Sequence, residues 1–335
     1  MKPNPAKSHT VAVSLAALLA ITSVVRADVE DKVTKSFTAA PGGQLFVELD
    51  RGSIEIKTAE AGSVDIEITS KAGGSRSQAE KTLADHIVTL TQTDNGVQVR
   101  SEYQGPRTRR WFGSSPQLQV QCVITVPREF DVDLKTAGGS INVTRLTGKL
   151  QANTAGGSLR FESIEGPISG HTSGGSIYVH DAKGKVNLRT AGGTVNLKAI
   201  EGNVNAHTSG GSIRAESLTG EAVVKTSGGS IQVADIKGAI EAGTSGGSIT
   251  ATLLEQPAKA CSFKTSGGSI TLVLDAQVAV DVDARTSGGR VTTDFPVVSV
   301  VQGEQKKHEL RGKINGGGPL LTAHTSGGSV RLQQN

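Results

Sequence analysis

The sequence predicts an all-β fold, a parallel β-solenoid of the β-helix or β-roll type, because one short motif recurs at a fixed interval through most of the chain. The motif is Thr-(Ser/Ala)-Gly-Gly, and its copies begin at Thr136, Thr154, Thr172, Thr190, Thr208, Thr226, Thr244, Thr265, Thr286 and Thr325. The first seven copies are spaced by 18 residues without a slip. Such an interval is typical of solenoids, in which each coil buries its apolar side only against neighbouring coils.

The composition also fits a regular stack of coils. The chain has 335 residues, with 42 glycines but only 7 Phe, 2 Tyr and 1 Trp. Small and β-branched side chains fill the even space above a pleated surface better than bulky ones do. A chain of this length could form two domains, but the unbroken repeat predicts one elongated domain.

Apolar positions within each unit predict two short strands per coil. With the signature Thr as position 0, apolar residues recur at +5 and +7 and again at +14 and +16, and glycine recurs at +12. In the coil that begins at Thr190, these positions are Val195, Leu197, Val204, Ala206 and Gly202. The two apolar pairs lie half a repeat apart, so we expect two parallel sheets that face each other across a thin core.

The two ends of the chain carry degraded versions of this pattern. We expect irregular first coils over residues 36–130, and the regular solenoid with a C-terminal cap over residues 131–335. Residues Ser75 to Ala84 predict a short helix, and Asn95-Gly96 predicts a hairpin turn. Irregular ends are expected of solenoids because terminal coils cap an open ladder.

Residues 1–27 are typical of a secretory signal peptide, with residues 28–35 as a linker. The segment begins with Lys2 and Lys7, continues with an apolar run from Val11 to Val25, and ends at Ala27. The apolar run is shorter than the ~20 residues that span a bilayer. We therefore expect an exported protein, periplasmic or at the cell surface, with no membrane span in the mature chain.

Removal of this segment changes the charge balance. Of the 35 basic residues, Lys2, Lys7 and Arg26 belong to it, which leaves 32 against 31 acidic residues. A net charge near +1 removes the compositional support for nucleic-acid binding.

The two cysteines are expected to be free. Cys122 precedes the first regular coil, and Cys261 follows about seven coils later. At ~4.8 Å per stacked strand the separation is roughly 34 Å, far beyond the ~7 Å that a disulfide allows between Cα atoms. Both thiols are therefore predicted to be buried and unpaired.

Several segments resemble a known family. These are Gly43 to Ile56, Val126-Pro127, the Gly-Gly-Ser-Ile repeats, Gly316 to Leu320 and Ser326 to Val330. Together they resemble the bacterial putative-adhesin family of β-strand-repeat proteins, a family defined as a domain of unknown function. The resemblance covers about residues 36–335 and implies an exported β-helical protein with an adhesive role. Its motifs are structural, so it implies no active-site residues.

Position −1, just before each signature Thr, is the first candidate binding surface. Its residues are Lys135, Asn153, His171, Arg189, His207, Lys225, Gly243, Lys264, Arg285 and His324. Eight of these ten can carry positive charge, so stacking would align them in a basic column that could bind an anionic envelope or surface polysaccharide. A solvated strand face whose like charges discourage aggregation would show the same pattern.

A second candidate lies between Pro106 and Pro116, where Arg109, Arg110 and Trp111 follow one another closely. Arginine and tryptophan are favoured anchors at binding sites. A loop that folds these side chains over the first coils as a cap would explain the same residues.

Metal, cofactor and catalytic sites are not indicated. Calcium-binding β-rolls place an Asp in each turn, whereas position +9 supplies acids only at Asp181 and Asp235. No stretch offers a nucleophile with a base, and the repeated hydroxyls suit bonding to local backbone.

Three functional hypotheses follow. The first is a non-enzymatic exported interaction module that acts as an adhesin. The second is a periplasmic envelope sensor or scaffold. The third is a β-helical polysaccharide lyase or hydrolase, which would require two or three carboxylates beside Arg or Lys on adjacent coils.

Overall fold

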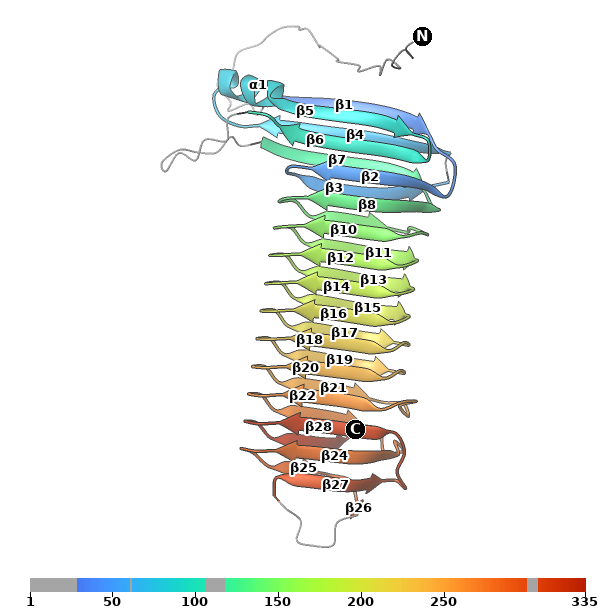
Figure 1. Ribbon diagram of the computed structural model, residues 1–335, viewed down its shortest axis with the longest axis vertical. Helices are drawn as coiled ribbons and strands as arrows, with labels where there is room; N and C mark the ends of the chain where they lie inside the picture. The colour runs from blue at the N-terminus through green and yellow to red at the C-terminus, as the bar shows by residue number, and fades with distance from the viewer. Residues whose placement is uncertain (1–28, 61, 106–117, 300–306) are drawn as a thin grey trace, which may run out of the picture.

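Two long sheets face each other in the computed structural model, which describes residues 29–60, 62–105, 118–299 and 307–335 (Figure 1). From the N-terminal end of the stack, sheet A contains β1 (Val29–Thr38), β4 (Ser63–Ala72), β7 (Leu118–Pro127), β3 (Ser53–Ala59), β9 (Ile141–Thr144), β11 (Leu159–Glu165), β13 (Ile177–Lys183), β15 (Val195–Glu201), β17 (Ile213–Leu218), β19 (Ile231–Ile236), β21 (Ile249–Leu253), β23 (Ile270–Leu274), β29 (Val330–Gln334) and β25 (Val291–Thr293). In the same direction, sheet B contains β5 (His86–Thr93), β6 (Gly96–Tyr103), β2 (Gly43–Leu49), β8 (Phe130–Thr136), β10 (Leu150–Thr154), β12 (Ile168–Thr172), β14 (Val186–Thr190), β16 (Val204–Thr208), β18 (Ala222–Thr226), β20 (Ile240–Thr244), β22 (Cys261–Thr265), β28 (Leu320–Thr325), β24 (Val280–Thr286), β27 (Glu309–Ile314) and β26 (Val297–Ser299).

Each regular coil contributes one strand to each sheet, as the apolar spacing predicts. In the coil that begins at Thr190, β15 buries Val195 and Leu197, and β16 buries Val204 and Ala206. Both strands pair in parallel with the strands 18 residues before and after them. The predicted stack of coils over residues 131–255 is confirmed, and alternate side chains form an outer face on each sheet.

The signature threonine is buried and joins neighbouring coils. Thr208 is fully buried, and its hydroxyl Oγ1 donates to the carbonyl oxygen of Gly193 in the preceding coil at 2.8 Å. The same oxygen accepts from the amide of Gly211 in its own turn at 3.2 Å. All ten signature threonines donate such a bond to a glycine carbonyl. The expected local bonding is therefore present, but each hydroxyl also bonds to an adjacent coil.

The two signature glycines have different roles. A Cβ on the second glycine, Gly193, would overlap the backbone carbonyl of Gly175 in the preceding coil. A Cβ on the first, Gly192, would lie 3.5 Å from the oxygen of Gly174, which is ordinary contact. Only the second position therefore requires glycine, because the backbones of stacked turns approach too closely for a side chain.

A left-handed residue lies near the end of six consecutive sheet A strands, or directly after the strand. The residues are Arg145, Ser163, Asp181, Ala199, Ser217 and Asp235, all at position +9, with φ between 53° and 57°. Non-glycine residues rarely adopt this conformation. This conformation recurs in six successive coils even though the residue type varies, so composition alone gave no signal for it.

At both ends of the stack, a terminal coil of the chain is inserted between two others. At the N-terminal end, β2 lies between β6 and β8, and β3 lies between β7 and β9. At the C-terminal end, β28 lies between β22 and β24, and β29 between β23 and β25. The tenth signature, at Thr325, therefore lies between the eighth and the ninth.

Antiparallel strands and one helix complete the ends. The predicted helix is α1 (Arg76–Ala84), with a capping box between Ser75 and Gln78. The predicted hairpin joins β5 to β6 through Asp94 and Asn95, and Gly96 is the first residue of β6. At the other end, β27 pairs antiparallel with both β24 and β26.

A half-buried histidine bridges the two sheets at the N-terminal end. His86 Nδ1 lies 3.1 Å from Ser70 Oγ on β4 of sheet A, and Nε2 lies 2.6 Å from Ser101 Oγ on β6 of sheet B. Both serines are buried. Burial lowers the pKa of His86, and this effect outweighs the nearby Asp31 carboxylate, which raises the pKa.

Both cysteines are free and buried, as predicted. Cys122 lies on β7 of sheet A and Cys261 on β22 of sheet B. Burial raises the pKa of the Cys122 thiol to about 12 and also raises that of Cys261. Neither thiol is therefore poised for thiolate chemistry at neutral pH.

The two signature glycines provide a matched pair of variants. Gly193→Ala forces the stacked turns apart, so we expect it to lower the free energy of unfolding by about 3 kcal/mol or more. Gly192→Ala meets only ordinary contacts and should change it by less than about 0.5 kcal/mol. Urea unfolding followed by circular dichroism measures both. Equal losses in the two variants would contradict close backbone stacking.

His86 should make stability depend on pH. Because its pKa is lowered in the folded protein, the unfolded chain binds a proton first as the pH falls through about 6.5. Stability is then fully present above that pH and decreases below it until the folded-state pKa is reached. In urea unfolding at a series of pH values, the curve of His86→Gln should be flatter over this window. A variant curve as steep as that of the wild type would rule out the assignment to His86.

Candidate functional site

Strand register aligns the position −1 residues in one column on the outer face of sheet B. His171, Arg189, His207 and Lys225 are consecutive cross-strand partners on β12, β14, β16 and β18. Because parallel strands are spaced by ~4.8 Å, one side chain follows another at that interval. The column continues in both directions through Lys135, Asn153, Gly243, Lys264, His324 and Arg285.

Carboxylates neutralise the column towards both of its ends. Lys135 pairs with Asp133 at 3.8 Å, and Lys225 pairs with Glu241 at 2.8 Å. Arg285 pairs with Asp283 at 2.7 Å. Among the described residues, no carboxylate pairs with His171, Arg189, His207 or Lys264.

The centre of sheet B carries a basic patch, which we define as His171, Lys185, Arg189 and His207. All four side chains are exposed. Their neighbours at position −3 on the same strands are Ser169, Asn187 and Asn205, which are neutral hydrogen-bonding side chains. No acid therefore occupies the outward positions of β12, β14 and β16, and the patch can offer its basic side chains to a ligand.

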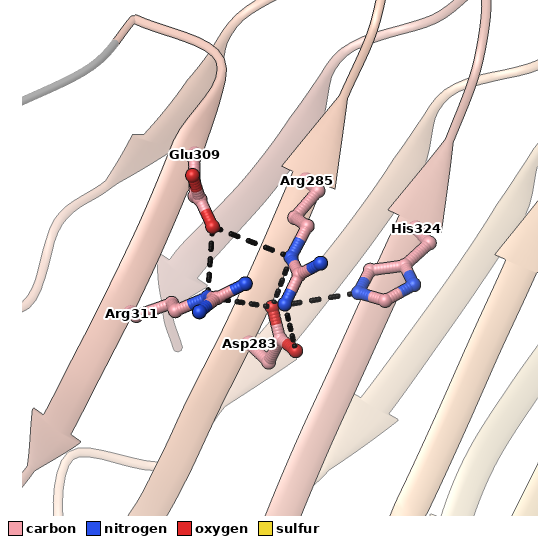
Figure 2. Close-up of polar contacts among 5 residues, drawn as sticks. All are labelled: Asp283, Arg285, Glu309, Arg311 and His324. Atoms are coloured by element: carbon pink, nitrogen blue, oxygen red, sulfur yellow. Dashed lines mark hydrogen bonds and ion pairs between the residues drawn. The ribbon is translucent and has the colours of Figure 1, made fainter.

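A compact ion-pair network lies at the C-terminal end of the same face (Figure 2). Arg285 donates to both carboxylate oxygens of Asp283, at 2.7 and 2.8 Å. Arg311 pairs with Glu309 at 2.7 Å and with Asp283 at 3.7 Å, and His324 Nε2 lies 3.4 Å from Asp283. Strands β24, β27 and β28 are thus joined through their outward side chains.

The network was not foreseen from the sequence. Glu309 and Arg311 lie on β27, which returns antiparallel beside β24. The sequence does show charged residues at every second position of both strands. They are Asp281, Asp283 and Arg285 on β24, and Glu309, Arg311 and Lys313 on β27. The two sets become neighbours through the antiparallel pairing of β24 with β27, which the 18-residue period does not predict.

The network has the composition that the enzyme hypothesis requires, but its carboxylates are already engaged. Asp283 and Glu309 each accept charge-assisted contacts from Arg285 and Arg311. A general acid or nucleophile must instead be available to a substrate. The arrangement is suited to holding β27 on the end of sheet B.

The two acids at position +9 are engaged in hydrogen bonds with serines one coil earlier. At position +9, Asp181 accepts a hydrogen bond from Ser163 and Asp235 accepts one from Ser217, both at 2.8 Å. Across the described ranges, no group of three or more His, Cys, Asp or Glu side chains is arranged to hold a metal ion. Arg109, Arg110 and Trp111 lie outside the described residues. No helix in the described part of the chain is long and apolar enough to cross a membrane.

The solved structures that match the chain have low sequence identity to it. One is a putative adhesin from Bacteroides fragilis, with 15% identity over 91% of this chain and 97% of that chain and a TM-score of 0.32. Another is a putative adhesin from Parabacteroides merdae, with 13% identity over 91% and 96% and a TM-score of 0.38. A third is a putative lipid binding protein from Parabacteroides distasonis, with 12% identity over 91% and 97% and a TM-score of 0.43.

No curated protein sequence matches the chain. A family model described as Toastrack DUF4097 matches residues 43–333, which include the irregular first coils, the regular repeat and the inserted last coil. Because this match spans most of the sequence, the chain belongs to the Toastrack family DUF4097, a domain of unknown function.

Proposed function

We propose that the protein is an exported, non-enzymatic interaction module that binds an anionic polymer of the cell envelope or surface. The observation that supports this proposal most directly is the basic patch, where exposed basic side chains lie on consecutive strands without outward-facing acids between them. The signal-like residues 1–27 support export to the periplasm or the cell surface.

The shape of the patch favours a long ligand over a small one. Its side chains follow the solenoid axis at ~4.8 Å intervals, so a polymer that lies along the axis contacts one row after another. Each exposed charge contributes little by itself, about 1 kcal/mol per Lys or Arg near an anionic surface. Affinity therefore accumulates with the number of rows and decreases as salt screens the charges over ~8 Å.

An adhesive role is consistent with such a surface. Adhesion requires an extended face that tolerates many weak contacts and resists unfolding, and a solenoid supplies both. A periplasmic sensor or scaffold would use the same surface, and the identity of the polymer decides between these roles.

The patch predicts a specific loss of binding in a double variant. Lys185→Gln with Arg189→Gln removes two unpaired charges, so affinity for polyphosphate at low salt should fall about 30-fold. Fluorescence anisotropy with labelled polymer measures the effect.

The matched control removes two charges from the other sheet. Lys57 and Arg331 both lie on sheet A with exposed side chains. The Lys57→Gln, Arg331→Gln double variant should change the affinity for the polymer by less than about threefold. If both double variants lost the same affinity, the net charge of the protein and not the basic patch would determine binding. If the wild type did not bind polyphosphate at low salt, the proposal would be wrong.

A further inference from the structure

A groove crosses the outer face of sheet A, on the side of the molecule away from the basic patch. It extends over β11, β13, β15, β17, β19 and β21 and has a volume of about 520 Å³. Side chains at positions +6 and +8 form its two walls, and the strand backbones form its floor. It therefore follows the solenoid axis, across the strands.

One wall of the groove presents an aromatic ring to solvent. Tyr178 is 36% exposed, and the guanidinium of Arg160 on the adjacent strand lies 4.9 Å from the ring centroid. Among the described residues, the other large apolar side chains exposed to this extent are Ile87, Leu254 and Leu320, which are aliphatic. An exposed ring held in place by arginine is a preformed platform for a flat apolar surface.

Hydrogen-bonding groups continue along the same wall. Asn196, Arg214 and Gln232 follow Tyr178 on successive strands. Arg214 Nε donates to Gln232 Oε1 at 3.0 Å, which orients the guanidinium and leaves its terminal amino groups free to donate. Such a fork suits a carboxylate, which it can bind through two parallel hydrogen bonds.

The opposite wall adds little free negative charge. Its acid, Glu216, pairs with Lys198 at 3.6 Å. Arg160 and Arg214 have no carboxylate partner among the described residues. They lie three strands apart, about 14 Å at the spacing of a parallel sheet. The groove thus combines an aromatic platform, amides and two unpaired guanidiniums along one line.

We propose that this groove binds an acidic sugar chain, an oligosaccharide containing uronic-acid units that lies along the solenoid axis. The apolar C–H face of a pyranose ring packs on Tyr178, a ring carboxylate pairs with Arg214, and hydroxyl groups bond to Asn196 and Gln232. A polyphosphate lacks the ring and a neutral glycan lacks the carboxylate, so neither uses the whole site. This inference does not depend on the basic patch.

Titration with tetragalacturonate tests the proposal by calorimetry on the full mature chain. Tyr178→Ala and Arg214→Gln should each weaken binding at least tenfold, because aromatic and arginine anchors carry most of the affinity at such sites. Tyr178→Phe should retain most of the binding, since it keeps the ring. Both positions are exposed, so unchanged circular dichroism should accompany the loss.

Matched controls separate the groove from the rest of the surface. Arg331→Gln changes an exposed arginine in the same column but outside the groove, and should leave tetragalacturonate binding unchanged. The Lys185→Gln, Arg189→Gln double variant of sheet B should also leave it unchanged. A loss confined to the sheet B variant would assign the sugar to the basic patch and overturn the groove.

Two further ligands test the chemical class. Cellotetraose, which has rings without carboxylates, and tetraphosphate, which has charge without rings, should each bind at least tenfold more weakly than tetragalacturonate. Equal binding of either ligand, or no binding of tetragalacturonate by the wild type, would overturn the proposal.

Discussion

The hydroxyl of the signature threonine is the contact on which the regular architecture depends. It donates to a glycine carbonyl of an adjacent coil in every signature, from Thr136 to Thr325. In nine of them it also accepts from an amide of its own turn. A buried backbone group without a partner is costly, so this one side chain allows tight turns to stack inside a thin core. It also fixes their spacing, because the carbonyl it reaches lies at one register only.

That fixed register determines which side chains become neighbours on the outer face of each sheet. Once turns stack without slippage, residues one period apart become cross-strand neighbours, as Arg189 and His207 do on sheet B. The same constraint places Tyr178 beside Asn196 on sheet A. Parallel strands in a fixed register therefore place residues that lie one period apart in rows with constant spacing. Both proposed ligands are chains for this reason, since rows of groups match polymers better than compact molecules.

The sequence was sufficient to predict what the period controls. The inward positions, the parallel pairing and the alignment of the basic column all follow from spacing, and the structure confirms them. Contacts made where the period fails could not be predicted. Thr325 lies between earlier signatures because the last coil is inserted into the stack, and Glu309 meets Arg285 only through an antiparallel return. The sheet A groove was missed because position +6 varies, from Tyr178 to Asn196 to Arg214, and shows no repeated residue type.

The stability of Thr208 variants tests the role of the hydroxyl most directly. Thr208→Val keeps the shape of the side chain but leaves the Gly193 carbonyl and the Gly211 amide without their partner. We expect a loss of about 1–3 kcal/mol in the free energy of unfolding by urea. Thr208→Ser keeps the hydroxyl and should lose only about 0.8 kcal/mol, for one methyl group. A valine variant as stable as the wild type, with a less stable serine variant, would contradict this role and show that burial of the methyl group, not the hydroxyl bond, holds the coils together.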